Sequence, residues 1–303
     1  MNRTLRLLAL ALLAQAAAAC AAASRPASAD RPRAADAPKF ATLAASDERG
    51  TAALANWKTV VGEQAAASSP APELRPVTAT VGSLPPGLDA APRMPLVVIS
   101  DEKTQTEEET RESLRRFIQT AAPLLGADPK DLSLVEVSEA QNGARTARYR
   151  QNPFTYPLRN GYGDVAVTFT DDLRVTGLSS TAVPEAERLR RALAAVAQGL
   201  PAFDPATLTN RAVTYTDRAG ARQTRPLSQS DAATVRQLVV YPLRRDADPS
   251  TLELHVAWET ATGAAASPLY VYVDAVTGEL LGASETVPEK TPPAPARPQT
   301  SGR

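Results

Sequence analysis

The pattern of hydrophobic and polar positions after residue 105 predicts a helix that packs against a core. Thr106 and Glu109 have the spacing of a capping box, in which the threonine oxygen accepts from the third helical N–H and the glutamate reaches back to the cap. Apolar residues then recur at helical spacing, at Leu114, Phe117, Ile118 and Ala121. Pro123 and Gly126 are typical of the end of such a helix.

Segments with the character of strands follow this helix, and the same order is then repeated. The first set covers 132–137, 146–151, 165–170 and 173–179, with Asp171 and Asp172 in a hairpin turn. A second helix begins at Pro184 and carries Leu189, Leu193, Val196 and Leu200 on one face. Strand-like segments then cover 211–216, 235–243, 252–259, 269–273 and 276–283, the last with a Thr277-Gly278 turn. This order predicts an α+β fold of two related halves, each a helix packed on an antiparallel β-sheet.

The remaining parts of the chain have weaker patterns. Apolar residues at helical spacing between Gly50 and Gly62 predict a short helix, and 76–81 and 96–99 look like short strands. The Pro- and Ala-rich stretches at both ends lack a core pattern, which predicts disorder. The chain therefore divides into a signal peptide (1–19), a tether (20–39), an N-terminal segment (40–73), two halves (74–180 and 181–287) and a Pro-rich tail (288–303).

The first residues have the features of a secretory signal. Arg3 and Arg6 precede an apolar run that ends in four alanines directly before Cys20, the only cysteine of the chain. This arrangement resembles the lipobox of bacterial lipoproteins, although Ala17 stands where leucine is usual. The resemblance implies that Cys20 is lipidated and anchors the protein to a membrane of the bacterial cell envelope. Because Ala21 replaces the aspartate that in some bacteria retains lipoproteins at the inner membrane, we expect the outer membrane, facing the periplasm or the cell surface.

Composition and charge exclude several classes of function. The 33 basic side chains are balanced by 33 acidic ones, which is unlike a nucleic-acid-binding protein. A single histidine cannot build a His-rich zinc site, and a single cysteine cannot form a disulfide within the chain. We therefore predict no metal site and no cofactor.

Candidate catalytic residues are few, and we predict that none of them is catalytic. His255 lies on the strand face that also carries Glu253 and Glu259, so a solvated or cross-strand-paired histidine is expected rather than a general base. Ser100 and Lys103 match the Ser-x-x-Lys pattern of penicillin-recognising enzymes, but the companion motifs are absent from the sequence. The acidic run 101–109 could bind calcium, although capping of the following helix is the simpler interpretation.

Two tyrosines are candidates for partner binding. Tyr270 and Tyr272 share one face of a predicted strand, with Val271 and Val273 on the other. They would form an exposed aromatic pair, since tyrosine is enriched at binding surfaces, or they would be ordinary half-buried sheet tyrosines. The sequence favours neither interpretation.

Several short motifs together resemble the propeptide of thermolysin-like and fungalysin-like metallopeptidases. Residues 148–151 (Arg-Tyr-Arg-Gln), the strand 163–169 and the segment 172–175 resemble the FTP domain, the front half of that propeptide. Residues 252–259 and 270–281, with the run Asp274 to Glu279, resemble its PepSY half. No His-Glu-x-x-His helix of a catalytic domain follows, and the link 153–160 is longer than in the family. The chain thus resembles a free-standing propeptide.

In that family the propeptide packs on the peptidase, assists its folding and blocks its cleft. The resemblance therefore implies a non-enzymatic protein that binds a thermolysin-like metallopeptidase as inhibitor or folding chaperone. It also implies that the partner is contacted near Glu285, Thr286 and Val287, within the segment 285–295. The alternative is a structural or adaptor lipoprotein of the envelope that uses the same fold with no peptidase partner. An enzyme that acts through Ser100 or His255 is the weakest of the three hypotheses.

Overall fold

The computed structural model describes residues 39–62, 69–88, 91–99, 106–139, 143–217, 219–228, 231, 233–263 and 268–285. Cys20, the predicted tether and the Pro-rich tail therefore lie outside the described residues. The described residues, from Lys39 to Glu285, belong to one compact unit. In the described residues, no helix combines the length and the apolar character needed to cross a membrane.

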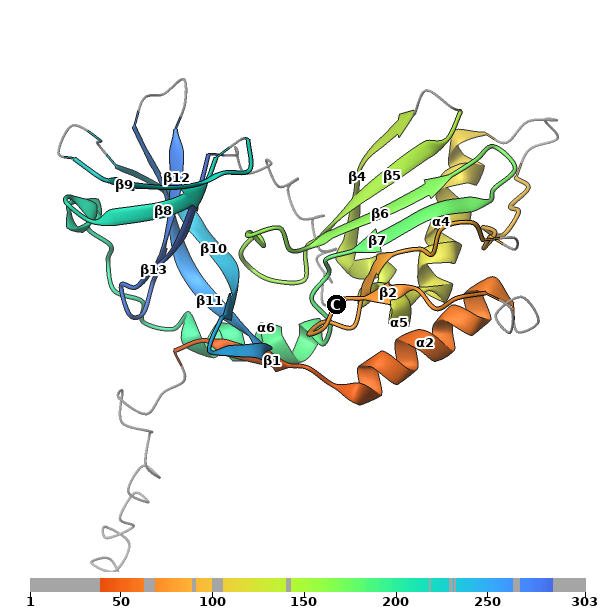
Figure 1. The fold of residues 1–303 in the computed structure, drawn as a ribbon, viewed down its shortest axis with the longest axis horizontal. Coiled ribbons are helices and arrows are strands. Elements are labelled where there is room, and N and C mark those ends of the chain that lie inside the picture. The colour runs from red at the N-terminus through yellow and green to blue at the C-terminus, as the bar shows by residue number, and fades with distance from the viewer. Residues whose placement is uncertain are drawn as a thin grey trace, which may run out of the picture. The chain divides into compact units, whose positions relative to one another are not determined.

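A helix followed by a four-stranded meander forms the first part of this unit (Figure 1). The helix α4 (Glu107–Thr120) continues through α5 (Ala122–Leu125) and the short 3₁₀ turn η1 (Pro129–Asp131). The strands β4 (Leu132–Glu139), β5 (Arg145–Gln151), β6 (Asp164–Phe169) and β7 (Val175–Ser180) pair antiparallel in that order. Leu114, Phe117 and Ile118 on α4 join one core with Val167 and Phe169 on β6. The predicted helix and strands are confirmed here.

The start of α4 has the geometry that its sequence predicts. Thr106 Oγ1 accepts a hydrogen bond from Glu109 N at 3.3 Å, and Glu109 Oε2 accepts one from Thr106 N at 2.9 Å. Two N–H groups that the helix itself cannot pair are thereby satisfied. The end of the acidic run, Glu107 to Glu109, therefore forms the first turn of α4, as expected if the run caps the helix. Residues 101–105 lie outside the described residues.

A larger sheet forms the second part. It follows α6 (Ala186–Val196) and η2 (Pro205–Leu208), and its strands are β8 (Ala212–Thr216), β9 (Arg222–Pro226), β10 (Thr234–Arg245), β11 (Asp248–Thr262), β12 (Leu269–Asp274) and β13 (Leu280–Ser284). The order is β1-β11-β12-β13-β8-β9, and β10 pairs with β11. Leu189, Leu193 and Val196 of α6 pack in one core with Leu252 and Leu254 of β11. The second helix is shorter than predicted, because it begins after Pro184 and ends at Val196, before Leu200. Its predicted strands are confirmed, and β9 is an addition.

The N-terminal segment contributes to both parts. The strand β1 (Ala41–Ala44) pairs antiparallel with β11, whereas the helix α2 (Asp47–Val61) places Ala53 and Trp57 in the core of the first part. The hairpin of β2 (Glu73–Leu74) and β3 (Val81–Ser83) follows. The helix begins before Gly50, because Ser46 caps it through a hydrogen bond from Arg49 N.

Two predicted strands are wrong. Residues 76–78 form the turn between β2 and β3, in which Ala79 N donates to the carbonyl oxygen of Arg75. Residues 94–99 form no strand: Leu96, Val98 and Ile99 are exposed, and only Val97 is buried among these four apolar side chains. A run of apolar residues forms a strand only where a sheet edge is free to pair with it. Only one isolated bridge lies next to this segment, between Arg93, just before it, and Arg174, which directly precedes β7.

The fold class is confirmed as α+β with mainly antiparallel sheets. Each part contains a helix followed by four consecutive strands that pair in order, β4 to β7 and β10 to β13. The second part differs by β1, β8 and β9, which extend its sheet. That the two halves are related stays a prediction.

Candidate functional site

His255 is buried in a polar cluster on the second sheet. Its Nδ1 lies 2.6 Å from Asp274 Oδ2 on β12, and its Nε2 lies 3.0 Å from Glu253 Oε2. Phe40 covers the ring, with 4.7 Å between the ring centroids. The cross-strand-paired histidine is confirmed, and the solvated one is wrong. Because both ring nitrogens face carboxylates, this geometry holds the sheet together and leaves neither nitrogen facing a substrate.

Asp274 fixes the hairpin between β12 and β13. Its Oδ1 accepts from Val276 N at 2.7 Å and from Thr277 N at 2.6 Å. Burial raises the pKa of Asp274, but the hydrogen bonds from His255, Thr277 and Val276 outweigh burial, so the pKa lies below its ordinary value. Gly278 follows with a φ of 71°, a conformation that favours glycine. The run Asp274 to Glu279 thus builds a turn.

Tyr270 and Tyr272 do not form an exposed pair. They keep only 6% and 4% of their surface accessible, and every residue of β12 is buried. The ring of Tyr272 lies 4.8 Å from that of Tyr241, and the guanidinium of Arg236 lies 5.0 Å from the centre of the Tyr270 ring. The interpretation as partner-binding residues therefore needs correction, because both faces of this strand are covered.

Glu259 forms a second buried polar cluster on β11, which the sequence analysis did not find. Its Oε2 lies 2.6 Å from Arg159 Nε, and its Oε1 lies 3.2 Å from Arg236 Nη1. Arg159 belongs to the segment 153–160, the link that is longer than in the propeptides that the sequence resembles. That segment also bridges to β10, where Leu158 pairs with Val240. In the sequence, only the unusual length of this link indicated that it makes contacts of its own.

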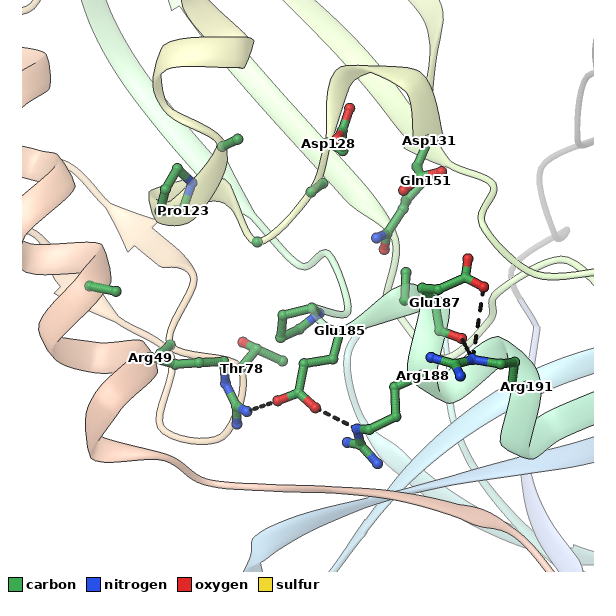
Figure 2. A pocket seen from close by; sticks show the side chains of 17 residues that line it. Arg49, Thr78, Pro123, Asp128, Asp131, Gln151, Glu185, Glu187, Arg188 and Arg191 are labelled. Atoms are coloured by element: carbon green, nitrogen blue, oxygen red, sulfur yellow. Dashed lines mark hydrogen bonds and ion pairs between the residues drawn. The ribbon is translucent and has the colours of Figure 1, made fainter.

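A cavity of about 600 Å³ opens before the first turn of α6 (Figure 2). Arg49 of α2 and Arg188 of α6 both contact Glu185, and Glu187 contacts Arg191. These arginines are therefore already neutralised by carboxylates of the same cavity. Figure 2 also shows Asp128, Asp131 and Gln151 at its edge. Burial raises the pKa of Asp131.

Gln151 joins β5 to the link between the two parts. Its Nε2 donates to the carbonyl oxygen of Val183 at 3.0 Å, and its Oε1 accepts from Val183 N at 2.8 Å. The side chain is 1% exposed, so both bonds are made away from water. The glutamine that ends the first motif of the resemblance thus has a structural role.

The predicted partner-binding tail begins at the end of β13. Glu285 follows this strand directly, whereas Thr286 and Val287 lie outside the described residues, as does Ser100. β13 meets β8 at a single parallel bridge, between Ser284 and Thr216. Beside that bridge lies a groove of about 430 Å³, lined by residues of β8 and β13 and by Tyr241. The chain therefore leaves the sheet beside an open groove.

Among the described residues, no three histidine, cysteine, aspartate or glutamate side chains are grouped so that they could hold a metal ion. Comparison with solved structures finds the Bacillus megaterium YpeB C-terminal domain, at a TM-score of 0.25 and 9% sequence identity. The match covers 69% of this chain and 74% of that chain. No family model matches the chain, and no curated protein matches it.

Proposed function

We propose that this chain is a non-enzymatic protein of the bacterial envelope, lipid-anchored at Cys20, that binds a thermolysin-like metallopeptidase as inhibitor or folding chaperone. Its two parts correspond in this proposal to the FTP and PepSY halves of a propeptide. The basis is the set of motifs at 148–151, 163–175 and 252–281, which lie in the sequence in the order that the family has.

The observation that supports this proposal most is that the motif residues make structural hydrogen bonds and ion pairs within the fold. Gln151 closes the end of β5 through two hydrogen bonds to Val183, and Asp274 closes the β12–β13 hairpin. Glu279 makes a bidentate contact to Arg245, at 2.8 and 3.0 Å. Motifs that build a scaffold suit a binding module, whose function lies in its surface.

The end of the second sheet supports the proposed contact with a cleft. β13 stops at Ser284, and the chain continues from Glu285 into a tail with prolines at 288, 292, 293, 295 and 298. Proline favours an extended backbone and cannot donate a ladder hydrogen bond, so such a tail is poorly suited to extend the sheet itself. It is better suited to lie in a partner's cleft.

An inhibition titration tests this proposal. The chain from Ala21 to Arg303 contains the compact unit whole, and is titrated against several thermolysin-like peptidases. We expect stoichiometric inhibition by a chain that stays uncleaved, and weaker inhibition by a chain that ends at Val287. Unchanged potency of the shorter chain would exclude the tail from the contact. No inhibition by a chain that shows a cooperative thermal transition would favour the adaptor role.

A further inference from the structure

Arginines in the described part of the chain are mostly paired with carboxylates, and Arg75 and Arg244 are exceptions. No carboxylate oxygen of the described residues lies within 4 Å of either guanidinium. By contrast, the neighbouring Arg245 contacts both Glu253 and Glu279. Arg211 and Arg222 also have no carboxylate partner among the described residues, so what sets Arg75 and Arg244 apart is that both line the same cavity.

The two arginines line one cavity of about 360 Å³. Arg75 follows β2, Arg244 lies in β10, and the remaining lining residues include Asn160, Tyr162 and Thr181 but no aspartate or glutamate. Arg75 is held in place by a hydrogen bond from its Nε to the carbonyl oxygen of Ser180, at 2.9 Å. This cavity thus differs from the one at α6, where glutamates already neutralise the arginines.

Tyr162 adds a hydroxyl to this pair of cations. It lines the same cavity as both arginines. Burial raises the pKa of Tyr162, while the charges of Arg244 and Arg75 act to lower it. A phenol and two guanidinium groups are all hydrogen-bond donors, and the planar guanidinium fits oxyanions in a bidentate way. The group of donors therefore matches an anion with several oxygens.

We propose that Arg75 and Arg244 bind a phosphate group, with the Tyr162 hydroxyl as a third donor. A phosphate monoester carries about −1.5 to −2 charges at pH 7, which matches two guanidinium groups better than a single carboxylate does. A cavity of this size accepts the phosphate together with a small part of the molecule that bears it. The phosphate belongs either to a free small molecule or to a lipid headgroup.

Isothermal titration of inorganic phosphate into the chain 21–303, at constant ionic strength, tests the site. We expect saturable binding at one site and at least tenfold weaker binding for Arg244→Gln, which breaks no ion pair of the described residues. Arg222→Gln is the matched control: Arg222 also lacks a carboxylate partner there, but it lines the groove beside β13 instead. Lack of saturation would overturn the proposal, and so would an equal loss for Arg222→Gln.

Two further arms separate the sources of the phosphate and guard against misfolding. Arg75→Lys keeps the positive charge but loses the planar guanidinium that can bind an oxyanion through two N–H groups. We expect phosphate affinity between that of the parent chain and that of Arg244→Gln, with an unchanged thermal transition. Sedimentation with vesicles that contain phosphatidic acid, whose headgroup is a phosphate monoester, would identify a headgroup if it is weakened by Arg244→Gln and by added phosphate. Binding of phosphate without sedimentation would identify a small molecule. The absence of both kinds of binding would refute the site.

Discussion

The two sheets differ in how many of their faces are buried. In β6 of the first sheet, Val165, Val167 and Phe169 are buried, while the two residues between them are partly exposed. In β12 of the second sheet all six residues are buried, and tyrosines and valines point into separate clusters. In the first sheet, the alternation of residues along a strand therefore shows which face is open to solvent. In β12 of the second sheet it does not, because both faces are buried.

Polar residues of the second sheet must consequently find partners inside the protein. His255 and Asp274 pair with each other, and Glu259 pairs with Arg159 from the segment 153–160. A buried charge without a partner costs far more than an exposed one. We therefore expect an ion pair to contribute most to the free energy of unfolding where both faces of a sheet are covered, and little on the first sheet, which has one face open to solvent.

The largest effect is expected for Arg159→Ala. This change leaves the fully buried Glu259 with only Arg236 and Gln237 beside it. We expect a loss of about 3 kcal/mol in the free energy of unfolding, measured by urea denaturation. Arg148→Ala is the matched control, since its pair with Glu136 joins two strands of the first sheet at the surface.

That control should lose at most about 0.5 kcal/mol, because exposed ion pairs contribute little. Similar losses for the two variants would break the contrast between the sheets. A larger loss for Arg148→Ala would reverse it.

A smaller effect is expected for Gln151→Ala, which removes both side-chain bonds to Val183. The N–H and carbonyl of Val183 would lose their partner in a buried place, at a cost of about 2 kcal/mol. Gln151→Glu is a sharper variant, because a carboxylate still accepts from Val183 N but cannot donate to its carbonyl. Chemical denaturation of both variants measures the cost, and an unchanged midpoint would show that the link is held elsewhere.

The smallest effect concerns the pH dependence of stability through Asp274. Its pKa in the folded protein lies below the ordinary value, so the unfolded chain binds the proton more readily. The contribution of this carboxylate is complete above the unfolded pKa of about 4 and is lost as the pH falls through the folded pKa. We expect Asp274→Asn to lose less stability between pH 5 and pH 2 than the parent chain. Equal slopes in urea titrations would contradict this role.

Local signals in the sequence predicted much of the fold. The capping box at Thr106 and the apolar stripe of α4 are local, and both are confirmed. β1 was missed because its partner strand β11 lies some 200 residues away, and a short Ala-Thr-Leu-Ala segment has no strong pattern of its own. The strand predicted at 96–99 failed for the converse reason, since its pattern was good but little sheet edge pairs with it.

The candidate site was less predictable than the fold. The sequence identified His255 and Asp274 as notable residues, but it could not show that covering both faces of the sheet buries them. The contact of Arg159 with Glu259 joins residues 100 positions apart, and only the unusual link at 153–160 hinted at it. Likewise, the cavity of Arg75 and Arg244 depends on elements that no local pattern connects.

Size-exclusion chromatography with light scattering tests the proposed partner binding most directly. The chain 21–303 and a thermolysin-like peptidase that it inhibits are mixed at equal concentrations and separated. A propeptide-like module predicts one species with the summed mass of one chain and one peptidase, in which the chain is intact. Two separate species, or a chain degraded by the peptidase, would contradict the proposal.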